Sequence, residues 1–239
     1  MNRVLYPANE RGHFDFGWLN TFHTFSFGQY YDPSRMGFGA LRVFNDDTVV
    51  AGSGFGTHPH KNMEIISIPL EGLIMHKDSM GHAEGIRPGE IQVMSAGSGI
   101  THSEYNGSPD EELKFLQIWI LPNQVDVQPR YDQANIGSIE LNSIKPIVGP
   151  QGVNTALWIH QQAYLSIGRT ANNSMIKYDP LLTNAGVFIF VIDGSLVVKD
   201  GASNVTLSQR DGLGIAGATS LCFATEHTAY FIAIEVPFL

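Results

Sequence analysis

An internal repeat of strand and turn segments constrains the fold of this chain more than any other feature. A run of strand-forming residues that ends in a glycine turn occurs at 64–72 and again at 186–194, and the two final glycines are 122 residues apart. A second turn glycine, Gly89, has a counterpart 123 residues later in Gly212. Offsets that agree to within one residue indicate a duplicated unit. We therefore expect two domains of the same fold, at residues 1–130 and 131–239.

The repeated unit is expected to be a β-barrel. Helical periodicity is almost absent, whereas short runs of β-branched and aromatic residues alternate with turn-forming residues throughout the chain. The 25 glycines and 12 prolines are spread along the sequence, which is typical of a protein with many short strands. The fold class predicted is all-β, with two antiparallel, jelly-roll-like barrels. The clearest strand segments in the first half are 40–44, 63–69, 91–94 and 113–120.

The charge and composition exclude several classes of protein. The formal net charge is -9 and the chain contains no basic run, so we expect no direct binding to nucleic acid or to an anionic membrane surface. No apolar stretch reaches the roughly 18 residues of a transmembrane helix, and the first residues lack an apolar segment of signal-peptide length. The single cysteine, Cys222, excludes an internal disulfide and is expected to be buried. These features predict a cytoplasmic protein.

Two pairs of polar residues predict a metal centre in the first half. His58 and His60 are two positions apart, as are His102 and Glu104. Because side chains alternate between the two faces of a strand, the members of each pair point the same way. Imidazole is the commonest protein ligand for first-row transition metals, and one carboxylate offsets part of the charge of a divalent ion. The four residues are therefore the candidate ligands of one divalent transition metal.

The residues around these pairs resemble the two metal-binding motifs of the pirin family, a branch of the two-domain cupins. Further strings at 23–27, 31–33, 41–43 and 117–119 fit the same branch. The resemblance is dense over residues 1–130 and weaker in the second half, and it implies a bicupin fold. The two motif strings are Gly56-Thr57-His58-Pro59-His60 and Ser95-Ala96-Gly97-Ser98-Gly99-Ile100-Thr101-His102-Ser103-Glu104.

The resemblance leaves two candidates for the carboxylate ligand. Most cupins use the glutamate of the first motif, which is Glu64 in this sequence. The pirin branch uses the glutamate two residues after the histidine of the second motif, which is Glu104. Both motifs have the pirin form, so we favour Glu104 as the ligand and as the catalytic base. Glu64 is then expected to be either a structural carboxylate or a supporting carboxylate that orients a ligand imidazole.

The resemblance also implies an activity. Within the pirin branch, this sequence resembles the bacterial quercetin 2,3-dioxygenases. We therefore expect a metal-dependent oxidoreductase that opens the heterocyclic ring of flavonols with dioxygen. Its partners would be a small aromatic substrate and dioxygen. We expect Fe(II) as the ion, although the donor set also suits Mn, Ni, Cu or Zn. The alternatives are a regulatory module that binds a protein partner and uses the metal as a structural or redox-sensing element, and a cupin enzyme for another small substrate.

Several aromatic residues and histidines have more than one interpretation. Ordinary core positions are favoured for the aromatic and sulfur-containing candidates, but each could line a substrate pocket. Structural or surface roles are expected for the remaining histidines, with His76 and His82 exposed beside a turn. His23 stands out because it lies in an aromatic string that resembles the family. The candidate pocket residues are Phe44, Phe55, Met94 and Trp119.

The second half is expected to lack the metal ligands. When residues are counted back from the second glycine turn, the counterparts of His58 and His60 are Pro180 and Leu182. The counterpart of His102 falls within 221–225, which contains no histidine. The expected role of the second domain is to pack against the first and to wall the cleft.

Overall fold

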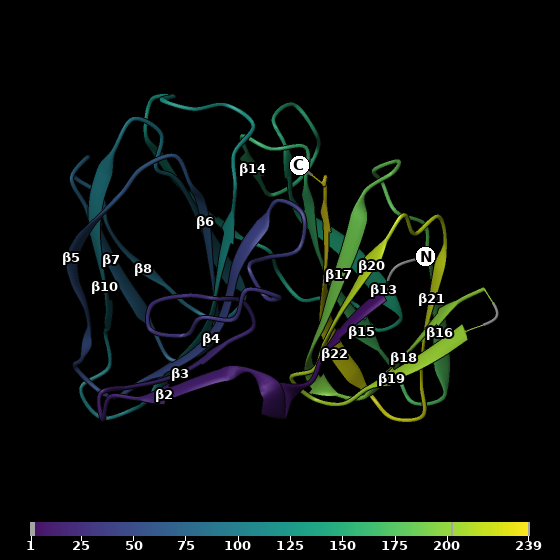
Figure 1. Cartoon of the computed structure of the whole chain (residues 1–239). Coiled ribbons are helices and arrows are strands. Elements are labelled where there is room, and N and C mark those ends of the chain that lie inside the picture. The colour runs from purple at the N-terminus through teal and green to yellow at the C-terminus, as the bar shows by residue number, and fades with distance from the viewer. Residues whose placement is uncertain (1–2, 202, 239) are drawn as a thin grey trace.

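The computed structural model describes residues 3–201 and 203–238, which form two β-barrels side by side (Figure 1). Within these residues the chain has 22 strands and one 3-10 turn, Ala8–Glu10. Each barrel consists of a larger and a smaller sheet. None of the helical structure in the described residues is long and apolar enough to cross a membrane.

The first barrel holds the strands of the N-terminal half. Its larger sheet, in spatial order, contains β12 (Arg130–Asn135), β9 (Glu90–Ser95), β6 (Glu64–Glu71), β11 (Leu113–Ile120), β4 (Leu41–Val49), β3 (Leu19–His23) and β2 (Gly12–Asp15). Its smaller sheet contains β5 (Gly54–His60), β10 (Ile100–Asn106), β7 (Ile74–Asp78) and β8 (Ala83–Ile86).

The second barrel holds most strands of the C-terminal half. Its larger sheet, in spatial order, contains β1 (Arg3–Tyr6), β20 (Gly212–Ala216), β17 (Gly186–Gly194), β22 (Ala229–Val236), β15 (Tyr164–Thr170), β13 (Ser143–Pro150) and β14 (Leu157–Ile159). Its smaller sheet contains β16 (Ser174–Tyr178), β21 (Leu221–Thr225), β18 (Leu196–Asp200) and β19 (Ser203–Leu207).

The two barrels share one topology, as the repeat predicts. The central order β9-β6-β11-β4 of the first larger sheet corresponds to β20-β17-β22-β15 of the second, and the two smaller sheets also correspond strand by strand. The pairs are antiparallel except for β13 with β14. The all-β, two-barrel expectation is therefore confirmed. Two strands cross between the halves, since β1 pairs with β20 and β12 pairs with β9, and the division at residue 130 stays a prediction.

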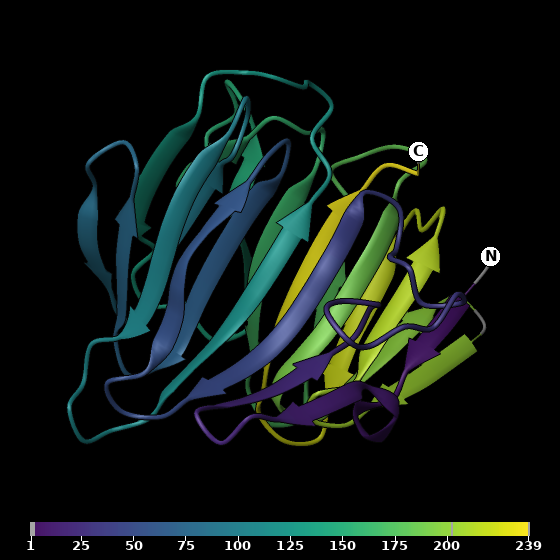
Figure 2. The ribbon, with the colours of Figure 1, turned by 60° about the vertical axis from the view of Figure 1, so that its left-hand side comes forward.

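The main core lies between the two larger sheets, which pack face to face (Figure 2). Alternate residues of the first larger sheet, such as Ile66 and Ile118, belong to the same buried cluster as Phe188 and Ile232 of the second. The intervening residues of the first sheet face the interior of their own barrel. The centre of each larger sheet is thus buried on both faces, which explains why central strands such as β6 and β17 are nearly continuous apolar runs.

Phe188 is at the centre of the contact between the barrels. Its ring lies 5.3 Å from that of Phe44, 5.7 Å from Phe25 and 5.8 Å from Tyr6, measured between centroids. Phe44 is fully buried and also packs on Phe190. The favoured interpretation of Phe44 as a core residue is therefore confirmed, and it is not a wall of the substrate pocket, because its side chain lies on the face of β4 that contacts the second barrel.

Replacing the central aromatic residue tests this core. Phe188→Ala should lower the free energy of unfolding by about 3–5 kcal/mol, because it removes a fully buried ring and leaves a cavity between two sheets. Met175, with 64% of its surface exposed, provides the control, and Met175→Ala should change stability by less than about 0.5 kcal/mol. Urea unfolding of both variants measures the difference, and equal effects would contradict the assignment of the core.

Candidate metal centre

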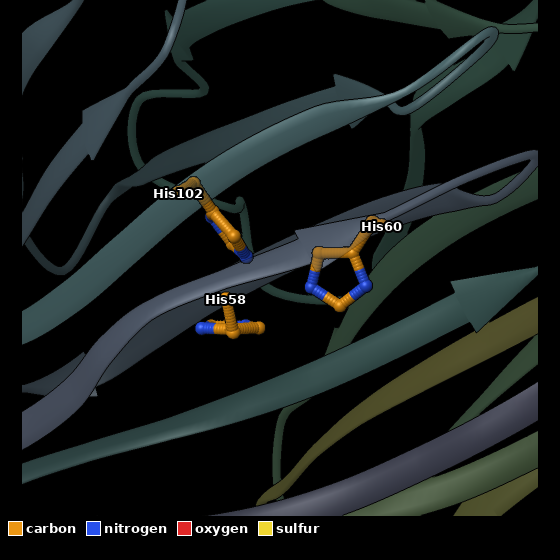
Figure 3. A group of neighbouring side chains, drawn as sticks. All are labelled: His58, His60 and His102. Atoms are coloured by element: carbon orange, nitrogen blue, oxygen red, sulfur yellow. The ribbon is translucent and has the colours of Figure 1, made fainter.

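Three of the predicted ligands converge inside the first barrel (Figure 3). His58 and His60 lie on β5, and His102 lies on the neighbouring strand β10 directly opposite His58. The ring centroids are 4.8 Å apart for His58 and His60, 4.6 Å for His58 and His102, and 4.8 Å for His60 and His102. One ring nitrogen from each residue lies within 4.8 Å of the others. The alternation of side chains along each strand thus produces the cluster that the spacing predicts.

The nitrogen atoms of these imidazoles suit a metal ion. Both ring nitrogens of His102 are buried and have no hydrogen-bond partner among the described residues, and an unsatisfied buried polar atom is costly unless something binds it. Nδ1 of His58 lies 2.7 Å from the carbonyl oxygen of Gly56. If that nitrogen carries the proton, Nε2 of His58 keeps its lone pair free for a ligand bond. The donor set fits a divalent transition metal.

Burial keeps two of these imidazoles, His60 and His102, neutral at neutral pH. It is the main cause that lowers the pKa of His60 to about 4, and the neighbouring imidazoles of His102 and His58 add to the effect. Burial, together with repulsion from His58 and His76, lowers the pKa of His102 to about 3. Neutral imidazole is the form that binds metals, so His60 and His102 can bind an ion without first losing protons.

Glu104 lies in a second group that shares His102 with the first. One carboxylate oxygen of Glu104 and one nitrogen each of His76 and His102 lie within 4.8 Å of one another. The side chain of Glu104 is 3% exposed. The structure therefore brings the three predicted histidines together in one group, and places Glu104 with His102 and the unforeseen His76 in the other.

Three side chains of the larger sheet hold the Glu104 carboxylate. Ser67 Oγ lies 3.0 Å from Oε1, Gln92 Nε2 donates to the same oxygen, and Gln117 Nε2 donates to Oε2 at 2.7 Å. A carboxylate has about four acceptor positions, so these contacts leave one position on Oε2 for a metal ion or a proton. The orientation of Glu104 is thus set from three different strands.

The donors to Glu104 belong to a polar row that crosses the larger sheet. His23, Asn45, Gln117, Ser67 and Gln92 lie opposite one another on β3, β4, β11, β6 and β9. All five face the barrel interior, and His23 alone was singled out from the sequence. For Ser67, Gln92 and Gln117, the signal that could have found them is a single polar residue at an inward position of a mainly apolar strand.

His76 is fully buried, so the expectation that it is exposed is wrong. It lies on β7 on the same face as Ile74 and Asp78 and stacks on Tyr131 with ring centroids 4.4 Å apart. Its Nε2 atom is 3.3 Å from the Asp78 carboxylate, which also lies 2.8 Å from Nδ1 of His82. The side chain of His82 is 38% exposed. Strand alternation, applied to residues 74–78, would have placed His76 inside the barrel.

Glu64 lies on the opposite face of the larger sheet from the three histidines. Its carboxylate accepts a hydrogen bond from Ser95 Oγ at 2.7 Å and lies 3.2 Å from Nδ1 of His160, a residue of the second half. Burial raises the pKa of Glu64. Of the two expected roles of Glu64, these contacts fit a structural carboxylate and not one that orients a ligand imidazole, because its imidazole partner is His160 in the contact between the barrels.

The equivalent positions in the second barrel are occupied by core residues. The strand registers place Val198 at the position of His76 and Phe223 at that of Glu104. Two residues before Phe223, Leu221 takes the position of His102 and pairs with Tyr178, the equivalent of His58. All four belong to one buried apolar cluster. The expected counterparts Pro180 and Leu182 are wrong in register, since both follow the end of β16.

A pair of fused β-barrels, with a His-x-His strand beside a His-x-Glu strand in the first, defines a two-domain cupin. Family models agree with this class. The pirin model matches residues 6–120, and the model of the quercetinase C-terminal cupin domain matches residues 146–236. With the relatives described next, these matches show that the chain belongs to the pirin family.

Three relatives illustrate the similarity. Quercetin 2,3-dioxygenase of Escherichia coli strain K12 is 40% identical over 98% of both chains. A pirin-like protein of Caulobacter vibrioides is 47% identical over 52% of this chain and 53% of its own. The crystal structure of the bacterial pirin YhhW from Escherichia coli in complex with nickel(II) superimposes with a TM-score of 0.92 at 39% identity, and covers all of both chains.

Removal of the shared histidine tests the metal centre. We expect one bound ion per chain in the parent protein and a loss of affinity in His102→Ala greater than the 10–100-fold typical of a supporting residue, because a buried donor common to both groups is removed. The exposed His13, which contacts Asn20, supplies the control variant His13→Ala. Elemental analysis of protein prepared without chelators gives the number of metal ions per chain. A full complement of metal in His102→Ala would contradict the assignment.

The support for Glu104 can be tested separately. Gln117→Leu removes the donor to Oε2 without changing a histidine, and we expect metal affinity to fall by about 10–100-fold. Gln161 is buried more deeply than Gln117 and donates to the backbone of Leu121 in another part of the molecule. Metal titration should therefore give parent-like affinity for Gln161→Leu. Similar affinities for the two variants would show that the hydrogen bond to Glu104 is unimportant.

Proposed function

We propose that this protein is a metal-dependent dioxygenase that opens the heterocyclic ring of flavonols such as quercetin with dioxygen. The observation that carries the proposal is the set of three converging imidazoles beside an anchored glutamate inside the first barrel. The name and 98% coverage of the Escherichia coli quercetin 2,3-dioxygenase support the choice of substrate class.

His58, His60, His102 and Glu104 are the proposed ligands of one divalent transition metal. Fe(II) is the proposed ion, and the nickel complex of YhhW supports a site for a first-row metal in this family. An ion bound there would lower the pKa of the acidic flavonol hydroxyl that lies next to the ketone. Glu104 is preferred to Glu64 because Glu64 faces His160 and the second barrel.

Glu104 is also the proposed proton acceptor, in a state in which its carboxylate is detached from the ion. Ser67, Gln92 and Gln117 fix its carboxylate, so the remaining acceptor position on Oε2 has a defined direction. Positioning a base in this way reduces the reorganisation needed when it takes the proton of the flavonol hydroxyl. Its small exposed fraction limits competition from water.

The two halves have different proposed roles. Residues 1–130 form the metal-binding cupin domain, and residues 131–239 form a cupin-like domain without these ligands. The apolar residues at the equivalent positions of the second barrel support this division. The second domain covers the outer face of the first larger sheet and supplies His160 as the partner of Glu64.

Paired glutamate variants test the proposal. We expect metal-loaded parent protein to consume dioxygen in the presence of quercetin. Glu104→Gln removes an anionic ligand and the proton acceptor, so metal affinity should fall and turnover should fall further, by about 10²–10⁴-fold. Glu64→Gln makes the same chemical change on the other face of the sheet, and its turnover should stay within about tenfold of the parent.

The outcomes separate the alternatives. A larger loss of metal and rate in Glu64→Gln than in Glu104→Gln would indicate the ligand set that most cupins use. A parent protein that binds metal but consumes no dioxygen with flavonols would favour a structural or sensing metal, and with it a regulatory role that involves a protein partner. Dioxygen electrode traces and metal analysis of the same preparations provide both measurements.

A further inference from the structure

A cavity of about 220 Å³ lies in the first barrel beside the candidate metal centre. Hairpin β2–β3, strands β4 and β5, and the segment 27–29 enclose it. Its walls are mainly aromatic and include Phe14, Phe16, Phe27 and Phe55. An apolar cavity of about 150 Å³ is large enough to hold benzene, so this one has room for a substituted six-membered aromatic ring.

The cavity is close to the proposed ligands. Phe27 packs edge-on against Trp119 with centroids 5.1 Å apart, and Trp119 packs in the same way on His60 at 4.9 Å. Phe55 lies opposite Glu104 in the pairing of β5 with β10. Trp119 is thus the one side chain between Phe27 in the cavity wall and His60 in the metal centre.

Four buried polar residues line this mainly apolar cavity. Thr21 is 2% exposed, His23 5%, Asn45 3% and Asp47 4%. Nδ1 of His23 and Oδ1 of Asn45 have no hydrogen-bond partner among the described residues. Asp47 accepts a hydrogen bond from Thr21. Apolar walls with a few convergent polar groups are typical of a small-molecule site, and the two unpartnered atoms give it specific positions for hydroxyl groups.

The protonation states of these residues suit a neutral ligand. Burial lowers the pKa of His23 to about 4, partly offset by a backbone hydrogen bond with Phe27, so the ring is neutral at neutral pH. Burial raises the pKa of Asp47 to about 7 despite the hydrogen bond from Thr21, so much of this carboxyl is also uncharged. A ligand with hydroxyl groups and no charge would satisfy these groups without the desolvation cost of an ion.

We propose that this cavity binds the hydroxylated 2-aryl ring of a flavonol, with Oδ1 of Asn45 and Nδ1 of His23 as hydrogen-bond partners of its hydroxyl groups. The inference rests on the proposed function. In a flavonol this ring is bonded to the carbon next to the one that carries the acidic hydroxyl. A molecule that presents that hydroxyl to the metal centre therefore has its aryl ring close by, where the cavity lies. Asn45 and His23 are then specificity-determining residues.

Substrate comparison tests the proposal in the metal-loaded protein. Quercetin carries two hydroxyl groups on the 2-aryl ring, and the control substrate is the flavonol that lacks both. The parent should prefer quercetin by at least about tenfold in kcat/KM, equivalent to one hydrogen bond of ordinary strength. Asn45→Leu keeps the approximate volume and removes the acceptor, so the preference should fall to near unity, chiefly through a higher KM for quercetin. Gln161→Leu is the burial-matched control and should keep the parent preference.

A second variant and a second ligand make the result independent of turnover. His23→Phe keeps a ring between Phe14 and Phe27 and removes Nδ1, so it should also reduce the preference for quercetin. Binding of 4-methylphenol and toluene, followed by NMR, should show tighter binding of the phenol to the parent and no difference in Asn45→Leu. The metal content of each variant shows whether a reduced preference for quercetin arises from loss of metal instead.

The two hypotheses fail in different ways. A parent protein that turns over no flavonol, yet binds 4-methylphenol more tightly than toluene in a manner that depends on Asn45, would support the cavity and refute the proposed function. Flavonol turnover with the same quercetin preference in the parent, Asn45→Leu and His23→Phe would overturn the cavity assignment. A parent without preference between 4-methylphenol and toluene would also overturn it.

Discussion

The first larger sheet is buried on both faces, and the rest of the structure depends on this constraint. One face packs against the second barrel through residues such as Ile66 and Ile118, and the other encloses the metal centre. Because side chains alternate along a strand, a shift of register by one residue would exchange the two sets. Ser67 and Gln117 would then enter the apolar core between the barrels. The packing of the barrels therefore also fixes the residues that face the metal centre.

The interior of the first barrel contains a polar row beside two apolar clusters, and most groups of the row satisfy one another. Gln92, Ser67 and Gln117 use their donors on Glu104, so a carboxylate that is almost fully buried keeps its hydrogen bonds. Buried polar networks are stable only when most members have partners. Among the described residues, eight buried side-chain atoms have no partner, and five of them belong to His23, Asn45, His76 and His102 at the metal centre and the adjacent cavity. The other three belong to Thr24, Gln92 and Trp119. Most of this unsatisfied hydrogen-bonding capacity thus lies where an ion and a hydroxylated ring are proposed to bind.

The second barrel shows that the scaffold does not require this chemistry. Tyr178, Leu221 and Phe223 fill the equivalent space with apolar packing. The buried carboxylate of Glu235 is satisfied locally, by the hydroxyl of Tyr178 at 2.5 Å and the backbone amide of Leu182 at 2.8 Å. An apolar interior stabilises a barrel by burial alone. The second barrel can therefore serve as the packing surface for the first larger sheet.

The amino-acid sequence by itself determined the repeated strand order, the all-β class and the pairs His58 with His60 and His102 with Glu104. These features depend on residues close together in the chain, where the period of a strand fixes which side chains share a face. The sequence also favoured Glu104 over Glu64, but only through the form of the family motifs. Local spacing carries no information on which strands become neighbours or in what register.

Only the tertiary structure decided the remainder of the site. Gln92 and Gln117 reach Glu104 because β9 and β11 both pair with β6, and His76 meets His102 because β7 pairs with β10. Glu64 is directed to His160 by the packing of two halves that are 96 residues apart at this contact. Each of these contacts joins strands that are distant in sequence, and their registers result from the simultaneous packing of both barrels.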